Sequence, residues 1–244
     1  MSSRRILLDA GNTRLKWAVV DSGLWLGQGS AEYSDLISLQ QVLDAGCDCY
    51  IASVTSVANE QRIDSLLASF DIVPRRLTSA PQFKELVNGY AHPQQLGVDR
   101  WMGLIAARRR TLEPTLVVSV GTAMTVDSLS AEGVFLGGLI VPGRDMMQQS
   151  LHQGTAHVGD GVGGWHAFPR TTADAVYSGI VTAMCGAIQA QHARLAEECG
   201  RTPRCMLTGG DALLLLPHLT VSVEHVPALV LEGIDRVASE DDMV

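Results

Sequence analysis

Two short glycine turns are the residues of this chain best suited to chemistry. Asp9-Ala10-Gly11-Asn12-Thr13 follows the apolar run Ile6-Leu7-Leu8, and Ser119-Val120-Gly121-Thr122 closes a second apolar run. Glycine carries no side chain, so the backbone N–H groups of such a turn can approach an anion closely. Together the turns predict a clamp for the phosphates of ATP, formed by two similar halves of the chain.

Two aspartates near these turns are candidate metal ligands. Asp9 ends the first apolar run, where its carboxylate could hold Mg²⁺ or the waters around it. Asp127 follows the second turn and could help to hold the metal, and a solvated aspartate near a turn is the alternative. The first turn taken alone is also typical of an ordinary hairpin, since hairpin turns favour Asp, Asn and Gly. The second turn argues against that alternative.

Asp99 begins a helical pattern that runs to Arg110. The positive end of a helix dipole favours the ionised carboxylate, which can then take a proton from an alcohol within hydrogen-bonding reach. An N-cap aspartate is the alternative, and the two roles are compatible. For Arg100 the alternative to a binding role is a surface ion pair, and for Tyr90 it is a packed loop aromatic with a satisfied hydroxyl.

Strand and helix patterns alternate along the chain and position these residues. Thr171 and Thr172 cap a long helix that ends before Gly200. Residues 239–244 are expected to form a frayed acidic tail. The expected strands are 6–8, 15–20, 24–28, 50–54, 115–120, 134–140 and 204–207, and the other expected helices are 36–43, 59–70 and 99–110.

The second half of the chain repeats the first with an offset of 110 residues. The offset places Ser119 at the position of Asp9 and Gly121 at the position of Gly11. The repeat predicts an α/β protein with two similar domains, residues 1–112 and residues 113–244.

Composition excludes several classes of protein. The net charge of −8 disfavours a nucleic-acid partner, and the one basic run, residues 108–110, suits the end of a helix. Charged residues make up 18%, below the usual ~25%, which favours an oligomer. Five cysteines without a Cys-x-x-Cys pair predict neither a disulfide framework nor a zinc site. With no signal-peptide pattern and no membrane-spanning apolar run, we expect a cytoplasmic protein.

Residues 159–164 match the string G-x-G-x-x-G. No strand pattern precedes them and no helix start follows, so a dinucleotide site is not expected there. A mobile loop is the favoured interpretation.

Five motifs in order along the chain resemble the bacterial type III pantothenate kinases. The resemblance covers residues 6 to about 235 and implies the acetate and sugar kinase, heat-shock chaperone and actin superfamily. The fold implied is two ribonuclease-H-like (actin-like) halves, with mixed sheets flanked by helices and a cleft between them. The motifs are Asp9-x-Gly11-Asn12-Thr13, Gly97-Val98-Asp99-Arg100, Gly121-Thr122-Ala123-x-Thr125-x-Asp127, Gly137-Gly138-x-Ile140-x-Pro142-Gly143, and Thr172 with Ser178-Gly179.

The activity implied by this resemblance is the ATP-dependent phosphorylation of pantothenate to 4′-phosphopantothenate, the first step of coenzyme A biosynthesis. Asp99 would accept the proton of the substrate hydroxyl, and residues 208–210 would hold the adenosine. The enzyme would be a homodimer in which Thr172 reaches the partner's pantothenate pocket. The ATP site would comprise Asp9, Ala10, Gly11, Asn12, Thr13, Arg14, Leu15, Lys16, Gly121 and Thr122, and the pantothenate pocket Tyr90, Gly97, Val98, Asp99, Arg100 and Thr172.

One residue departs from the family pattern. Many members carry Asp where this chain has Ser119, and that Asp ligates an activating K⁺ or NH₄⁺. A neutral hydroxyl is a poorer cation ligand than a carboxylate, so this chain is expected to lack that site or to use other oxygens.

Two other functions remain open on the sequence. A sugar or acetate kinase of the same superfamily would explain the two turns but not residues 97–100 or Thr172. A catalytically weak nucleotide-binding regulator is the second, because a relative of the family is known as an accessory factor for gene expression. The intact Asp9, Asp99 and Thr122 argue against lost catalysis.

Overall fold

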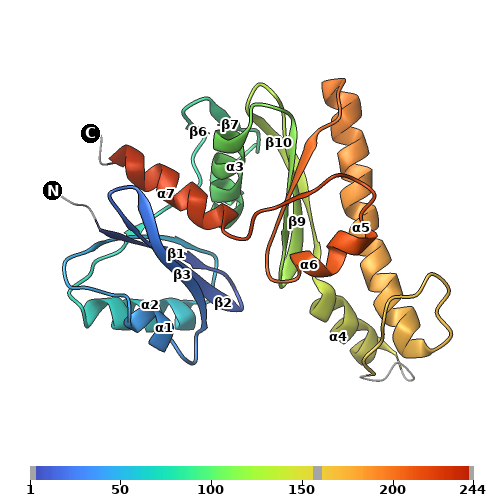
Figure 1. Cartoon of the computed structure of the whole chain (residues 1–244), viewed down its shortest axis with the longest axis horizontal. Coiled ribbons are helices and arrows are strands. Elements are labelled where there is room, and N and C mark those ends of the chain that lie inside the picture. Colours follow the sequence, from blue (N-terminus) through green and yellow to red (C-terminus); the bar gives the residue numbers. More distant parts are fainter. Residues whose placement is uncertain (1–3, 156–160, 242–244) are drawn as a thin grey trace. The chain divides into compact units, whose positions relative to one another are not determined.

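The computed structural model describes residues 4–155 and 161–241. The chain divides into two compact units, one formed by residues up to Arg110 together with those from Ala228 onward, the other by Thr111–Pro227. Each unit contains a mixed sheet flanked by helices, as predicted (Figure 1). The C-terminus differs from the expected division, because helix α7 (Leu229–Asp241) packs on α3 (Val98–Arg110) in unit 1.

The sheet of unit 1 has the order β3-β2-β1-β4-β5. Its central strand β1 runs antiparallel to β2 and parallel to β4. β3 is antiparallel to β2, and β5 is parallel to β4. All six residues of β1 are buried, as expected for an apolar strand between two neighbours. The strands are β1 (Arg5–Ala10), β2 (Arg14–Asp21), β3 (Leu24–Glu32), β4 (Asp48–Ser53) and β5 (Arg75–Arg76).

Two expectations for unit 1 were wrong: the extent of one helix and the frayed tail over residues 239–241. The helix expected over 36–43 is only one turn, because the N–H groups of Val42 and Leu43 bond to carbonyls three residues back. Residues 239–241 are helical rather than frayed, since Lys84 Nζ lies 2.6 Å from Glu240 Oε1. Residues 242–244 lie outside the described chain. The remaining elements of unit 1 are α1 (Ile37–Gln40), α2 (Val57–Ala68), β6 (Gln82–Phe83), β7 (Leu86–Asn88) and the 3₁₀ turn η1 (Pro93–Gln95).

Unit 2 repeats the sheet of unit 1 strand for strand. Five of its strands lie in the order β12-β11-β8-β9-β10. β8 is antiparallel to β9 and parallel to β11. β10 runs antiparallel to β9, as β3 does to β2, and β12 runs parallel to β11, as β5 does to β4. This equivalence confirms the predicted duplication. The strands are β8 (Thr115–Val120), β9 (Ala123–Leu129), β10 (Val134–Pro142), β11 (Arg204–Thr208) and β12 (Glu224–His225).

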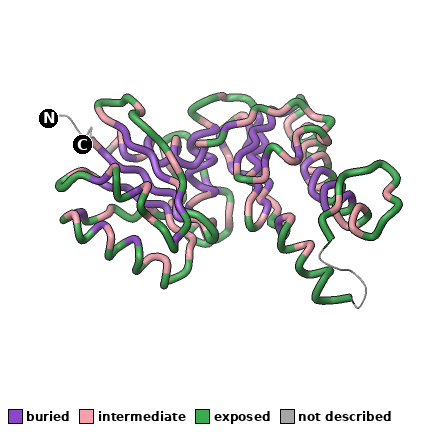
Figure 2. Tube along the Cα trace, turned by 60° about the horizontal axis from the view of Figure 1, so that its bottom comes forward, coloured by how far each residue is buried: buried purple, intermediate pink, exposed green. Residues whose placement is uncertain are grey.

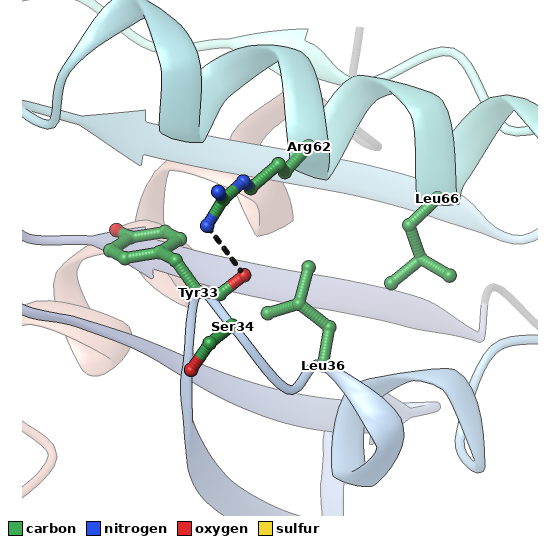
Figure 3. Close-up of a pocket in the computed structure, with 5 residues that line it drawn as sticks. All are labelled: Tyr33, Ser34, Leu36, Arg62 and Leu66. Atoms are coloured by element: carbon green, nitrogen blue, oxygen red, sulfur yellow. Dashed lines mark hydrogen bonds between the residues drawn. The ribbon is translucent and has the colours of Figure 1, made fainter.

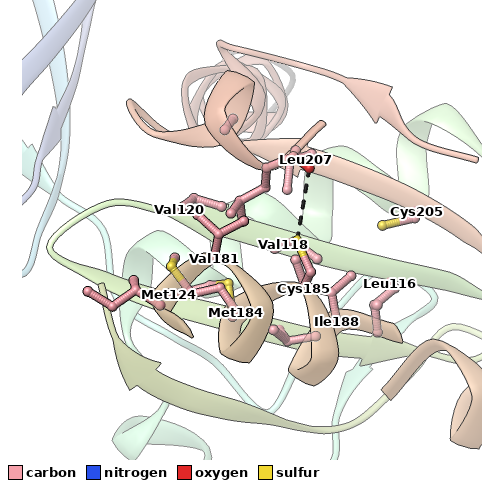
Figure 4. Close-up of a cluster of buried hydrophobic side chains, with 14 of the residues drawn as sticks. Leu116, Val118, Val120, Met124, Val181, Met184, Cys185, Ile188, Cys205 and Leu207 are labelled. Carbon is pink, nitrogen blue, oxygen red and sulfur yellow. Dashed lines mark hydrogen bonds between the residues drawn. The ribbon is translucent and has the colours of Figure 1, made fainter. Parts of the chain in front are cut away.

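The long helix α5 (Thr172–Cys199) packs on this second sheet. It begins after Thr171, whose hydroxyl accepts the Asp174 N–H, and ends at Gly200 with a left-handed φ of 66°. Both ends are where the sequence predicted them. Figure 4 shows its side chains Val181, Met184 and Ile188 against Leu116, Val118 and other strand residues. The other helical segments are α4 (Arg144–Gly154), α6 (Ala212–Leu215) and the 3₁₀ turn η2 (Leu216–His218).

Buried residues are concentrated in the two sheets and on the helix faces that cover them (Figure 2). All five cysteines are free, and burial raises the pKa of the Cys49 and Cys205 thiols to about 12. Within the described residues, no helix is both long and apolar enough to cross a bilayer.

The packing of α7 on α3 depends on a glycine. A Cβ on Gly233 would lie 1.9 Å from the carbonyl oxygen of Met102. We expect Gly233→Ala to lower the free energy of unfolding by about 3 kcal/mol, because the added methyl group forces the α3 backbone to move. Urea unfolding followed by circular dichroism measures the change.

Gly154→Ala is the matched control, since Gly154 also lies in a helix and a Cβ there would meet nothing within 4 Å. That variant should be as stable as the wild type or slightly more stable. Equal stabilities of the two variants would contradict the account of α7.

Candidate active site

The first glycine turn joins β1 to β2 and exposes the backbone of Asn12 and Thr13. A Cβ on Gly11 would lie 3.3 Å from the carbonyl oxygen of Arg14, so the chain is closely folded there. The Tyr33 hydroxyl donates a 2.5 Å hydrogen bond to the Gly11 carbonyl. Sequence reasoning missed Tyr33, because only the β2–β3 register brings it to the turn.

Asp9 and Lys16 face each other across the β1–β2 ladder that leads into this turn. The Lys16 Nζ atom lies 3.9 Å from Asp9 Oδ2, and Asp9 is only 7% exposed. Burial raises the pKa of the Asp9 carboxyl to about 6, while the charge of Lys16 lowers it and that of Asp99 raises it. Asp9 and Asp99 are therefore electrostatic neighbours within unit 1.

Asp99 is the second residue of α3, which begins at Val98, one residue earlier than expected. Burial raises the pKa of Asp99, opposed by the N–H and charge of Arg100 and by the charge of Lys16. A Cβ on Gly97 would lie 2.6 Å from Asp99 Oδ1. The absence of a side chain at Gly97 thus leaves room for the Asp99 carboxylate.

Arg100, which follows Asp99 in the sequence, contacts the side chain of Tyr90. Arg100 Nη1 donates to the Tyr90 hydroxyl at 3.0 Å, and the guanidinium carbon lies 5.6 Å from the centre of the Tyr90 ring. Arg100 is 7% exposed, so the alternative of a surface ion pair is wrong. The adjoining Val98 is also buried.

The second glycine turn, in unit 2, is held by backbone contacts. The Gly143 N–H donates to the Thr122 carbonyl at 2.9 Å, and a Cβ on Gly143 would lie 2.0 Å from the Gly121 carbonyl oxygen. Gly209 has a φ of +101°, and a Cβ there would lie 2.1 Å from the Val120 carbonyl oxygen. Glycine is required at both positions, so the Pro142-Gly143 and Thr208-Gly209-Gly210 segments lie against the Gly121-Thr122 turn.

The three other predicted residues of unit 2, Ser119, Asp127 and Thr172, lie in surroundings that differ from one another. Ser119 pairs with Thr125 and Thr208 on the neighbouring strands. Asp127 is 1% exposed and four residues along β9 from Ala123, roughly 13 Å by the rise of a strand. Asp127 is therefore neither solvated nor beside the turn. Thr172 is exposed in the first turn of α5.

The loop before α5 contacts that helix through three of its glycines. Gly161–Gly164 have no regular structure, but a Cβ on Gly163 would lie 2.1 Å from the Ala173 carbonyl oxygen, and the Gly164 N–H donates to Asp174 Oδ1 at 2.9 Å. Gly161, Gly163 and Gly164 contact the first turn of α5, whereas Val162 is 98% exposed, and the mobility of the loop stays a prediction. Residues 159 and 160 lie outside the described chain.

Asp9 could hold Mg²⁺ at the first glycine turn. Across residues 4–155 and 161–241, no group of three or more His, Cys, Asp and Glu side chains is placed to bind a metal. Mg²⁺ in phosphoryl-transfer sites commonly uses one or two carboxylates, with water and substrate phosphates completing its shell. The buried Asp9 carboxylate, whose charge Lys16 offsets only in part, fits such a site.

The raised pKa of Asp9 has a consequence for stability. Between about pH 4 and pH 6 the folded protein holds a proton on Asp9 that the unfolded chain has lost, so stability falls as the pH rises through this window. We expect Asp9→Asn to raise the free energy of unfolding by about 1–3 kcal/mol at pH 8 and by much less at pH 4. Urea unfolding at both pH values measures the difference.

Asp71→Asn is the control for this experiment, because Asp71 is exposed and its φ of 58° suits asparagine. It should not change the pH dependence. An equal effect of Asp9→Asn at pH 4 and pH 8 would show that burial of the carboxylate charge is not the cause.

Two solved structures share the fold. A putative Baf family transcriptional activator from Campylobacter jejuni is 18% identical with a TM-score of 0.63, covering 98% of this chain and 100% of the other. A putative 2-dehydro-3-deoxygalactonokinase from Sinorhizobium meliloti is 13% identical with a TM-score of 0.58, covering 97% and 99%. These likenesses support the predicted fold of two similar α/β halves.

Sequence comparison identifies the family. The family model of type III pantothenate kinase matches residues 5–194. A type III pantothenate kinase of Thiobacillus denitrificans is 58% identical over 238 residues, 98% of each chain, and one of Chromobacterium violaceum is 40% identical over 236 residues, 96% of this chain and 99% of the other. The chain is a member of the type III pantothenate kinase family.

Proposed function

We propose that the protein transfers the γ-phosphoryl group of ATP to pantothenate, giving 4′-phosphopantothenate and ADP in the first step of coenzyme A biosynthesis. The observation that carries the proposal is the shared neighbourhood of Asp9, Lys16 and Asp99 in unit 1. A carboxylate at a phosphate-binding turn and another at a helix N-terminus supply a metal ligand and a base. The family membership supports the same activity.

In the proposed mechanism Asp99 is the general base. It accepts the proton of the substrate's 4′-hydroxyl as that oxygen attacks the γ-phosphorus, and the bond from phosphorus to the ADP oxygen breaks. The ionised Asp99 is stabilised by the N–H and charge of Arg100 and by Lys16. Lys16 also lowers the pKa of Asp9, which keeps a second carboxylate available for Mg²⁺. The metal would neutralise phosphate charge.

Pantothenate binding is assigned to residues around Asp99. Arg100 is a buried guanidinium, and such groups recognise carboxylates through paired N–H donors, as the pantothenate carboxylate requires. Tyr90 fixes Arg100 through its hydroxyl and ring. Gly97 leaves room for the Asp99 carboxylate, and Val98 begins the helix that carries it. Thr172 would contribute from the partner subunit.

ATP binding is assigned to both glycine turns. Residues 9–16 would bind phosphate oxygens through backbone N–H groups, as would Gly121 and Thr122. Residues 208–210 would hold the adenosine. Ser119 offers a cation only a hydroxyl, so the proposal includes no K⁺ ligation by its side chain. Asp127 is not proposed as a metal ligand, because it is buried away from the turn.

We also propose a homodimer formed through α5. Its outer face carries a row of exposed small residues and has no Asp, Glu, Lys or Arg from 175 to 193. Small residues allow two helices to approach closely, and an uncharged exposed face favours burial against a partner. The free thiols fit a reducing compartment, and a cytoplasmic location is proposed. The row comprises Ala175, Gly179, Thr182, Ala183, Gly186, Ala190 and Ala193.

Removal of the base tests the mechanism. With ATP, Mg²⁺ and pantothenate, we expect Asp99→Asn to lower kcat by about 10²- to 10⁴-fold, the usual effect of losing a general base. Because burial raises the pKa of Asp99, the wild-type kcat/KM should fall on the acid side at a pH above the ordinary range of aspartate, and the variant should keep only the part of this limb that is set by Asp9. A coupled ADP assay measures both.

Asp71→Asn, at an exposed turn of unit 1, should retain the wild-type rate. An Asp99→Asn variant as fast as the wild type would rule out the base. A wild-type protein that turns over no pantothenate, with or without K⁺, would instead favour the nucleotide-binding regulator.

The dimer is tested by a charge on the row of small residues. Ala183→Arg should convert the dimer to a monomer and lower activity, because a charged side chain on α5 would have to be buried. Size-exclusion chromatography with light scattering gives the mass. Ala68→Arg, exposed at the end of α2, is the matched control and should remain dimeric. A monomeric wild type, or a dimeric Ala183→Arg, would contradict the interface.

A further inference from the structure

Tyr33 lies beside the first glycine turn although 22 residues separate it from Gly11. The β2–β3 ladder ends with Arg14 opposite Glu32, and Tyr33 is the next residue. A tight turn follows, in which the Asp35 N–H donates to the Glu32 carbonyl at 2.9 Å. The strand register and this turn together place the Tyr33 side chain against the end of β1.

The Tyr33 hydroxyl is a buried donor. The residue is 8% exposed, and its hydroxyl donates to the Gly11 carbonyl oxygen at 2.5 Å. Burial raises the pKa of Tyr33, and the nearby charges of Asp9 and Glu60 raise it further, while a hydrogen bond with Thr55 lowers it. The hydroxyl therefore stays protonated, and it donates to the turn throughout the neutral range.

The bond to Gly11 also sets the direction of the next N–H group. The Gly11 carbonyl and the Asn12 N–H belong to one planar peptide unit, which is trans, as are all the described peptide bonds. In a trans unit the two groups point in opposite directions. Because the carbonyl is turned toward Tyr33, the Asn12 N–H is turned away from it. Asn12 as a whole is exposed, and its N–H points away from Tyr33.

Tyr33 is itself held at its backbone. Figure 3 shows Arg62 of α2 reaching across to the Tyr33 carbonyl, where Nη1 donates at 3.2 Å. Leu36 and Leu66 line the same groove of about 500 Å³, together with Ser34. The groove leaves one side of this segment without packed neighbours, so the bond from Arg62 restrains the Tyr33 backbone there.

We propose that Tyr33 is a positioning residue for ATP: its hydroxyl holds the Gly11 carbonyl so that the Asn12 N–H faces the bound phosphate. The inference rests on the proposed function, because it assigns a phosphate to this turn. In this role Tyr33 would act through the Gly11 carbonyl and not through direct contact with a substrate. Its effect is exerted through one peptide unit, and it should therefore change ATP binding and leave the chemistry of Asp99 unaltered.

Tyr33→Phe tests this role with the whole chain, ATP, Mg²⁺ and pantothenate. The KM for ATP should rise about tenfold, a change of about 1.4 kcal/mol and within the range of one lost hydrogen bond. kcat and the KM for pantothenate should change less than about twofold. A purely structural role would lower the fraction of active protein and leave the KM for ATP unchanged, which would overturn the inference.

Tyr50→Phe is the matched control. Tyr50 is 1% exposed and its hydroxyl accepts a 2.9 Å hydrogen bond from Arg75, at the β4–β5 edge of the same unit. This variant also loses a buried hydroxyl but should keep the wild-type KM for ATP. A rise equal to that of Tyr33→Phe would overturn the inference, because any buried hydroxyl would then have the same effect.

A direct readout is the backbone amide signal of Asn12 in ¹⁵N NMR. In the wild type a non-hydrolysable ATP analogue should shift this signal strongly, and in Tyr33→Phe the shift at equal occupancy should be at most half as large. An unchanged shift would contradict the role of the peptide unit. If Tyr33→Phe does not fold, Arg62→Met serves instead, with an expected two- to threefold rise in the KM for ATP and an unchanged value as the contradicting result.

Wild-type turnover separates the two proposals. If the wild type phosphorylates pantothenate and Tyr33→Phe has the same KM for ATP, the positioning role fails and the proposed function stands. If the wild type is inactive, the proposed function is wrong, whatever the result for Tyr33→Phe.

Discussion

A carboxylate buried at the end of β1 is the constraint on which the site in unit 1 depends. Asp9 lies among apolar strands, and Lys16, whose Nζ is 3.9 Å from Asp9 Oδ2, offsets its charge in part. The effect of desolvation on the Asp9 carboxyl is larger than that of Lys16, so its pKa is raised to about 6, and repulsion from Asp99 contributes to this rise. A chain selected for stability alone would not place two carboxylates there. A bound cation would offset this repulsion, as the proposed site for a metal-bound nucleotide requires.

Comparison of the two sheets distinguishes contacts that both units share from residues that occur in one unit alone. In both units the segment after the parallel strand crosses the end of the central strand: the Val54 N–H bonds to the Ala10 carbonyl, and the Asp211 N–H bonds to the equivalent Val120 carbonyl. This crossing belongs to the fold. The ion pair of Asp9 with Lys16 becomes Ser119 with Thr125 in unit 2. The charged pair of unit 1 therefore has no counterpart at the equivalent positions of unit 2.

The sequence predicted the parts of this structure that local rules decide. Strand runs, the glycine turns, the duplication and both ends of α5 follow from apolar patterns and capping residues within a few positions. Long-range packing decides the rest. Nothing local indicates that α7 joins unit 1, where Gly233 permits close approach to Met102, or that Asp127 is buried. The contact of Tyr33 depends on the β2–β3 register, which shifts between Val19 and Val20.

The two glycine turns also differ in how their carbonyl groups are held. In unit 2 the donor to Thr122 is the backbone N–H of Gly143, which every residue except proline would supply, although only glycine fits the space. In unit 1 the donor to Gly11 is the hydroxyl of one side chain, Tyr33. A backbone donor is fixed by the fold, whereas a side-chain donor can be lost in a single substitution that preserves packing. On the proposed function, the first turn is therefore the one whose affinity for phosphate would change without a change of fold.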